Sequence, residues 1–148
     1  LALAPRGDGH AVLVLPGLLA GDASLTTLHA YLRYLGYATS GWEQGLNVGR
    51  WETLEPLLAT FDRLHETHGS SVSLVGWSMG GLYARELARR RPAAVRLLVQ
   101  LGTPFGRAVR TNPNWPIYEL TSGEPVENAA AHGGVTPRPP VPTVSIWS

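Results

Sequence analysis

One serine of the chain stands between an apolar run and a helical pattern, with glycines on both sides. The run SVSLVG covers residues 71–76, and the pentapeptide GWSMG at 76–80 fits G-x-S-x-G. Where a strand turns sharply into a helix, a serine hydroxyl is lifted above the sheet and can attack a carbonyl carbon if a base accepts its proton. The residue types at this corner therefore point to nucleophilic chemistry at Ser78.

The two glycines that flank the serine fit that chemistry. Gly76 and Gly80 would face neighbouring backbone, where any Cβ would collide. The helix predicted over 79–90 points its unpaired N–H groups and its positive end at the serine. Negative charge that develops on an oxygen at this point is stabilised without rearrangement of the protein.

The elements that position the serine follow from an alternation of apolar runs and amphipathic stretches. Strands are predicted at 10–17, 37–42, 71–76, 95–102 and 142–148, and helices at 22–36, 50–69 and 79–90. This alternation predicts an α/β fold with a doubly wound, mostly parallel sheet, in one domain over 1–148. Residues 103–141 are rich in proline, and we interpret them as an irregular, lid-like excursion with a short helix near Trp115–Leu120.

The predicted strands also place particular residues together. Ligands of open α/β sheets bind at the carboxyl ends of the strands. Gly17, Ser78, Thr103 and Ser148 each follow a predicted strand, so we expect them at one edge of the sheet.

Three stretches resemble the α/β-hydrolase family, and within it the lipases and esterases. LVGWSMGG (74–81) resembles the family's nucleophile elbow, VLVLPGLLAG (12–21) its first oxyanion loop, and VRLLVQLGTP (95–104) the strand after the elbow. Pro16 stands where the family commonly has a histidine. The resemblance covers most of 10–105 together with 142–148. It implies that Ser78 is the nucleophile of an acyl-enzyme mechanism, that the N–H groups of Leu18 and Met79 bind the oxyanion, and that neither a cofactor nor a metal is needed.

The partners of the serine are harder to find. In this family an acid and then a histidine follow the serine along the chain. No aspartate follows Ser78, the later acids are all glutamates, and His132 is the one later histidine. A second account is that VPTVSIWS (141–148) resembles the family's penultimate strand, with the acid and the histidine beyond it. On that account the hydrolase core is incomplete at its C-terminal end, and these 148 residues alone hydrolyse esters feebly.

The amino-acid composition excludes some kinds of catalysis and some kinds of binding partner. The formal net charge is +1, and the chain has neither cysteine nor lysine, which excludes thiol and Schiff-base catalysis. We expect a small ester with an apolar acyl group as substrate, no nucleic-acid partner and no membrane span, because no apolar run reaches 18 residues. If the sheet ends at 148, its last strand is an open edge that could pair with another chain. A cytoplasmic location is favoured and secretion is left open.

Several features allow an ordinary structural explanation beside a functional one. Trp77, Trp115 and Tyr118 are candidates for a substrate pocket, although aromatic residues also anchor loops. We interpret Asp22 as a helix cap and the pair His65 and His68 as the end of a helix. The same catalytic parts would serve an acyltransferase or a thioesterase, and the fold could also form a non-catalytic binding module.

Overall fold

The computed structural model describes residues 4–104, 113–129, 131 and 137–146. Its strands form one sheet, in which every neighbouring pair is parallel. The spatial order is β2-β1-β3-β4-β5, with β1 at Ala11–Leu15, β2 at Ala38–Ser40, β3 at Val72–Trp77, β4 at Val95–Leu101 and β5 at Thr143–Ile146. The predicted parallel α/β sheet is thereby confirmed.

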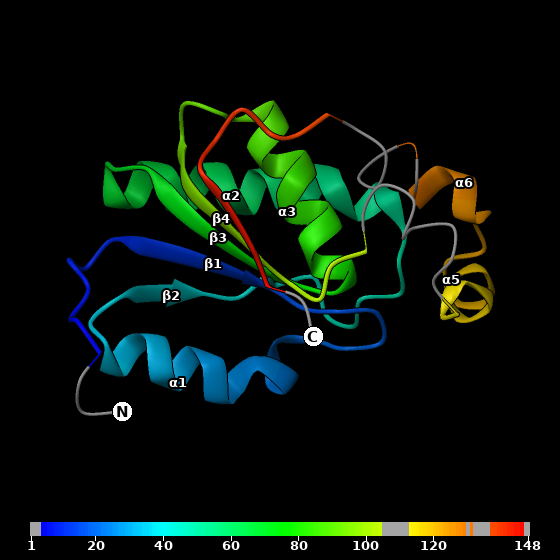
Figure 1. Ribbon diagram of the computed structural model, residues 1–148, viewed down its shortest axis with the longest axis horizontal. Coiled ribbons are helices and arrows are strands. Elements are labelled where there is room, and N and C mark those ends of the chain that lie inside the picture. The colour runs from blue at the N-terminus through cyan, green and yellow to red at the C-terminus, as the bar shows by residue number, and fades with distance from the viewer. Residues whose placement is uncertain (1–3, 105–112, 130, 132–136, 147–148) are drawn as a thin grey trace.

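Helices cover both faces of the sheet (Figure 1). The helix α1, Thr26–Tyr34, follows a short 3-10 turn, Asp22–Leu25, and packs on one face. A second 3-10 turn, Trp51–Thr53, leads into α2, Leu54–His68, which packs on the other face beside α3, Met79–Arg90. Because successive strand residues point to opposite faces, the fully apolar β1 supplies both cores. Among the described residues, no helix combines the length and apolar character needed to cross a membrane.

Two further helices lie beyond the carboxyl ends of the strands, at the right of Figure 1. They are α5, Trp115–Ser122, and α6, Val126–Ala129. Helix α5 confirms the short helix predicted near Trp115–Leu120, with Pro116 in its first turn and Gly123 in a left-handed conformation at its end. The sequence did not predict α6, because four residues are too few to show a helical period.

A polar cluster ties the amino ends of the strands together. His10, just before β1, bridges two partners: its Nδ1 lies 2.5 Å from Asp8 Oδ1, and its Nε2 lies 2.8 Å from the Ser73 hydroxyl. Arg96 of β4 also pairs with Asp8, at 2.8 Å. The hydrogen bonds from His10, together with Arg96, hold the pKa of the Asp8 carboxyl well below its usual range. This cluster lies at the amino ends of the strands, whereas Ser78 follows the carboxyl end of β3.

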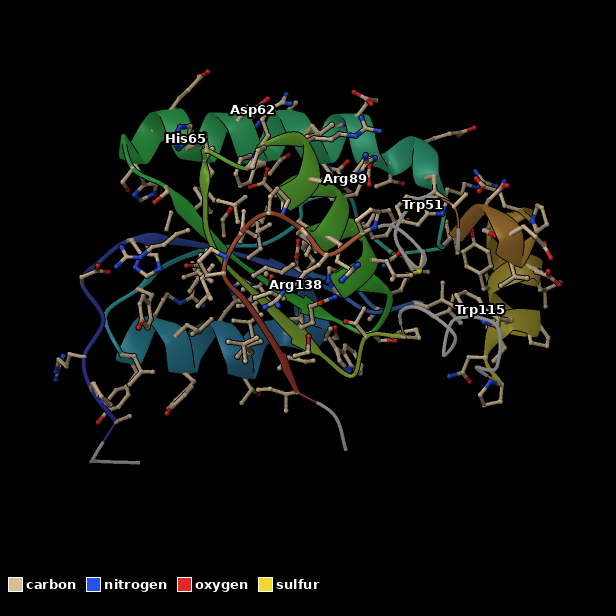
Figure 2. All side chains as sticks on the ribbon, turned by 45° about the horizontal axis from the view of Figure 1, so that its top comes forward. Trp51, Asp62, His65, Arg89, Trp115 and Arg138 are labelled. Carbon is tan, nitrogen blue, oxygen red and sulfur yellow. The ribbon has the colours of Figure 1, made fainter. Side chains whose placement is uncertain are left out.

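Charged pairs also form within α3 and between the end of α3 and α2. The Glu86 carboxylate is buried and accepts hydrogen bonds from Arg89 and Arg90 at 2.6 to 3.0 Å. Arg91 donates two hydrogen bonds to Asp62 of α2, both at 2.8 Å. In Figure 2, Asp62 and Arg89 lie well away from the end of the molecule that holds Trp115. The Arg91–Asp62 pair joins the end of α3 to α2, whereas the Glu86 pairs lie within α3, and all of these residues lie outside the cavity described next.

Candidate active site

The serine corner has the backbone that a nucleophile elbow requires. Strand β3 ends at Trp77, α3 begins at Met79, and Ser78 between them has φ +50° and ψ −118°. A non-glycine residue in this region is strained, and it persists only where its surroundings hold it. Two hydrogen bonds do so here: the Ser78 N–H donates to the Leu101 carbonyl oxygen at 2.8 Å, and the Ser78 carbonyl oxygen accepts from the Gly81 N–H at 3.0 Å.

The glycines around the corner are required by close backbone contacts. A Cβ on Gly76 would lie 2.5 Å from the Gly81 Cα and 2.6 Å from the Gly80 carbonyl oxygen. A Cβ on Gly80 would collide with the carbonyl oxygens of Leu15 and Pro16, at the end of β1. Gly76 therefore lets β3 lie directly against the first turn of α3, and Gly80 lets that turn lie directly against the end of β1.

That loop, residues 16–20, passes beside the serine. A Cβ on Gly17 would be 3.4 Å from the Ser78 Cβ, and Leu18 and Met79 line the same cavity as the serine. Among the described residues, neither the Leu18 N–H nor the Met79 N–H has a hydrogen-bond acceptor. Met79 is also the first residue of α3, where the helix has its positive end.

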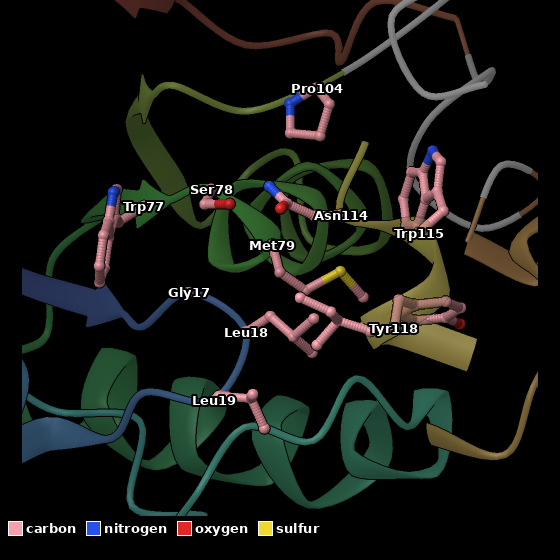
Figure 3. Close-up of a pocket in the computed structure, with 11 residues that line it drawn as sticks. Gly17, Leu18, Leu19, Trp77, Ser78, Met79, Pro104, Asn114, Trp115 and Tyr118 are labelled. Atoms are coloured by element: carbon pink, nitrogen blue, oxygen red, sulfur yellow. The ribbon is translucent and has the colours of Figure 1, made fainter. Parts of the chain in front are cut away.

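A cavity of about 240 Å³ opens above the serine. Figure 3 shows Ser78 between Trp77 on one side and Asn114, Trp115 and Tyr118 on the other, with its hydroxyl oxygen pointing away from Trp77. The predicted pocket residues Trp77, Trp115 and Tyr118 thus lie around one cavity with Ser78, Leu18 and Met79. The remaining lining residues are Gly17, Leu19, Pro104, Asn114 and Ile117.

The cavity wall is uncharged among the described residues that line it. Tyr118 is completely buried, and this burial, with the nearby negative charge of Glu124, raises its pKa to about 12. The phenol is therefore neutral at physiological pH. Its ring packs edge-on against Trp115, with 5.2 Å between the ring centroids. Such a wall suits an uncharged, largely apolar ligand.

The histidines that the structure describes all lie away from the serine. His10 belongs to the polar cluster at the amino ends of the strands. His29 is buried on α1, and burial, with the positive charge of Arg33, lowers its pKa. His65 and His68 are in the last turn of α2, where His65 Nδ1 lies 2.8 Å from the Ser70 carbonyl oxygen. His132, the candidate base within the chain, lies outside the described residues.

The later glutamates are engaged elsewhere or exposed. Glu86 is held by two arginines. Glu119 accepts the Val126 N–H, Glu124 accepts from Asn128, and Glu127 is exposed. Among the described residues, none forms a hydrogen bond with the Ser78 hydroxyl. The described part of the chain thus places Ser78, Leu18 and Met79 around one cavity, without an acid or a base.

Asp22 does not act as the predicted helix cap. Its carboxylate makes no capping hydrogen bond and instead accepts the N–H groups of Trp42 and Glu43, at 2.9 and 3.1 Å. A short acidic side chain can bond to any nearby backbone N–H, and here the loop after β2 offers two of them. Asp22 therefore ties the loop after β1 to the loop after β2.

Solved structures of other proteins have a similar fold. The chain superimposes on MGS-MChE2, an alpha/beta hydrolase enzyme from the metagenome of sediments of the Mar Chica lagoon in Morocco, with a TM-score of 0.62 and 19% identity, over 96% of this chain and 69% of that one. It is also similar to the mature lipase BlEst2 of Bacillus licheniformis (TM-score 0.59, 16% identity, 86% and 57% of the two chains). A third similar structure is the monoacylglycerol lipase of Paleococcus ferrophilus (TM-score 0.53, 23% identity, 70% and 42%).

At these identities the likeness concerns the backbone and not the chemistry. The chain spans only about half the length of the two lipases. No protein-family model and no curated protein sequence matches it. The five-stranded parallel sheet and its likeness to these structures nevertheless agree with the expectation from the sequence: the chain has the α/β-hydrolase fold, shared with esterases and lipases.

Proposed function

We propose that the protein is a serine hydrolase that cleaves carboxylic esters through an acyl-enzyme on Ser78. The observation that carries the proposal is the strained conformation of Ser78 at the start of α3, beside a cavity that Leu18 and Met79 also line. Strain of this kind costs about 1–3 kcal/mol, and it clusters at functional sites because the special geometry is useful there.

The proposed reaction proceeds in two halves. The Ser78 hydroxyl oxygen attacks the ester carbonyl carbon, a base takes its proton, and the carbonyl oxygen becomes negatively charged. The N–H groups of Leu18 and Met79 donate to that oxygen, and collapse of the intermediate expels the alcohol, which takes the proton back. Water then attacks the acyl-enzyme by the same steps and releases the acid. His132 stays the candidate base within this sequence.

The uncharged cavity supports an apolar ester as substrate. A volume of about 240 Å³ suits a short or medium acyl group better than a bulky polar one. Two of the similar structures are a lipase and a monoacylglycerol lipase, and this agrees with the same substrate class. Acyl transfer and thioester hydrolysis use the same parts and differ only in the acceptor or the leaving group.

A non-catalytic binding module is the alternative of a different class. Such a module gains nothing from a strained serine, so selection would be expected to relax the corner. The retained strain therefore favours the enzyme.

A fluorophosphonate probe tests the proposal directly. We expect the protein to be labelled on Ser78, as located by peptide mass spectrometry, and the Ser78→Ala variant to remain unlabelled. If His132 is the base, hydrolysis of p-nitrophenyl butyrate should be readily measured and should fall by about 10⁴-fold or more in Ser78→Ala, because the activated nucleophile is lost.

The matched control is Ser73→Ala. Ser73 is on the same strand and is the serine that contacts His10, so it offers the competing serine–histidine pair. Labelling should be unchanged in this variant. Labelling that persists in Ser78→Ala, or that disappears in Ser73→Ala, would contradict the proposed nucleophile. A further His132→Ala variant decides whether that histidine is the base.

A further inference from the structure

Asn47 is a completely buried polar residue in the loop between β2 and the Trp51–Thr53 turn. It lies outside the cavity, and sequence reasoning gave it no role. Its backbone and side chain together form four hydrogen bonds of 2.7 to 3.0 Å. Three of the four reach the loop that follows β1, which carries the Leu18 amide.

The contacts of Asn47 bracket that amide. The Asn47 side-chain Nδ2 donates to the Pro16 carbonyl oxygen at 2.9 Å, and the Asn47 carbonyl oxygen accepts the Leu19 N–H at 2.7 Å. The peptide group between Gly17 and Leu18 lies between these two anchored peptide groups. This middle peptide group is also held directly, because the Ala20 N–H donates to the Gly17 carbonyl oxygen at 3.2 Å, and the two Asn47 contacts restrain it from both sides. Leu19 itself has φ +58°, a conformation that needs such support.

The same side chain also sets the wall of the cavity. Asn47 Oδ1 accepts the Gly49 N–H at 3.0 Å, and Gly49 has φ +86°. A Cβ at Gly49 would lie 2.8 Å from the Tyr118 ring and 3.2 Å from the Leu18 side chain. One amide thus holds the backbone under both the proposed oxyanion donor and an aromatic residue of the cavity.

At neutral pH an amide can make both side-chain contacts and an ionised carboxylate cannot. Asparagine offers a donor to the Pro16 carbonyl and an acceptor for the Gly49 N–H, whereas an ionised aspartate offers acceptors alone. On the basis of the hydrolase function proposed above, we propose that Asn47 is the positioning residue of the oxyanion hole and aims the Leu18 N–H at the oxygen that becomes charged during attack by Ser78.

The first experiment compares Asn47→Asp with Gln44→Glu. Gln44 lies in the same loop and donates to the Trp42 carbonyl oxygen at 3.1 Å, so both changes remove one amide donor from a backbone carbonyl. The measurement is the kinetics of fluorophosphonate labelling of Ser78, separated into the limiting rate and the half-saturating probe concentration. We expect the limiting rate of Asn47→Asp to fall by about 10- to 100-fold, with half-saturation changed less than about twofold, because a misaligned donor affects the transition state. Gln44→Glu should stay within about twofold of the unchanged protein.

The pH profile separates positioning from a loss of structure. Once protonated, the carboxyl group of the Asn47→Asp variant would again donate to the Pro16 carbonyl, so its rate relative to the unchanged protein should rise as the pH falls from about 8 to about 5.5. A buried carboxyl titrates above its usual range, which brings this rescue into an accessible window. A loss equal to that of Gln44→Glu, a loss in half-saturation only, or a flat pH ratio would overturn the role of Asn47.

A second measurement needs no variant. An alkylboronic acid adds to a reactive serine and places a negative oxygen where the oxyanion would lie. In ¹H–¹⁵N spectra of the unchanged protein, we expect the amide signals of Leu18 and Met79 to shift more than those of the rest of the chain. A shift of Met79 without Leu18 would overturn the role of Asn47 and leave the hydrolase function intact. Absence of both boronate binding and Ser78 labelling would overturn both.

Discussion

At the scale of single residues, the site depends on glycines, because a side chain at these positions would collide with neighbouring atoms. Gly76 and Gly80 have no side chain where backbone atoms of neighbouring segments lie within 3 Å of the Cβ position. Gly81 is a third such residue, since a Cβ there would collide with the buried hydroxyl of Thr103 at the end of β4. The corner can therefore press against both β1 and β4, which keeps Ser78 in its strained conformation.

We expect Gly80→Ala to lower the free energy of unfolding by about 3 kcal/mol, because the new methyl group meets backbone carbonyls that cannot move aside. Labelling of Ser78 by the fluorophosphonate probe should fall together with stability. The measurements are urea unfolding followed by circular dichroism and labelling of the variant at a temperature where it is folded.

Gly69→Ala is the control for that change. Gly69 has φ +60° at the end of α2 and open space around it, so alanine there meets backbone strain without a collision. Its expected cost is about 1 kcal/mol. Equal losses in the two variants would show that close packing at Gly80 is unimportant.

At the scale of elements, α5 forms the cavity wall opposite the loop after β1. Ile117 lines the cavity and is half-exposed, whereas Leu120, one turn further, is 85% exposed and does not line it. The helix therefore offers one face to a ligand, and its outer face supplies a matched control.

Ile117→Ala should lower kcat/KM for a p-nitrophenyl ester with a medium-length acyl chain by about tenfold, since apolar contact with the substrate is lost. Leu120→Ala should leave kcat/KM unchanged within about twofold. Steady-state hydrolysis of esters of increasing chain length checks both. An equal effect of the two substitutions would remove α5 from the binding site.

The sequence predicted the regular elements better than the loops between them. The apolar run of β1 and the helical period of α2 are visible in the sequence because burial of these elements requires them. The G-x-S-x-G motif located Ser78. Asn47 carries no such signal, because a buried loop amide depends on which two loops meet in space. The glycines at 45 and 49 around it, both with positive φ, were the available hint of a constrained loop. Asp22 was assigned to the nearest helix, whereas its bonding partners lie about 20 residues further along the chain.

At the scale of the whole molecule, the pKa shifts link stability to pH. Burial alone would raise the pKa of Glu86, but the hydrogen bonds from Arg89 and Arg90 outweigh it and the pKa lies below its usual value. A carboxyl with a lowered pKa in the folded state stabilises the protein above its unfolded pKa, about 4.3, and this contribution is lost as the pH falls through the lowered folded value. The hydrogen bond from Arg91 lowers the pKa of Asp62 in the same direction.

We expect Glu86→Gln to lower the free energy of unfolding by about 2 kcal/mol at pH 7, because charge-assisted hydrogen bonds of a buried carboxylate are lost. The difference from the unchanged protein should shrink between about pH 4 and pH 2, where the unchanged protein loses the same charge. Urea titrations across this range measure it. Glu55→Gln removes an exposed partner of Arg90 and should change stability little at any pH, and a pH-independent deficit in Glu86→Gln would contradict the linkage.

The cluster of Asp8, His10, Ser73 and Arg96 fastens the strands at their amino ends, while the loops around Ser78 occupy the other end of the same strands. The parts that hold the sheet in register are therefore not the parts that would meet a substrate. Replacement of the loops around Ser78 should therefore change which compounds are accepted and leave this cluster in place.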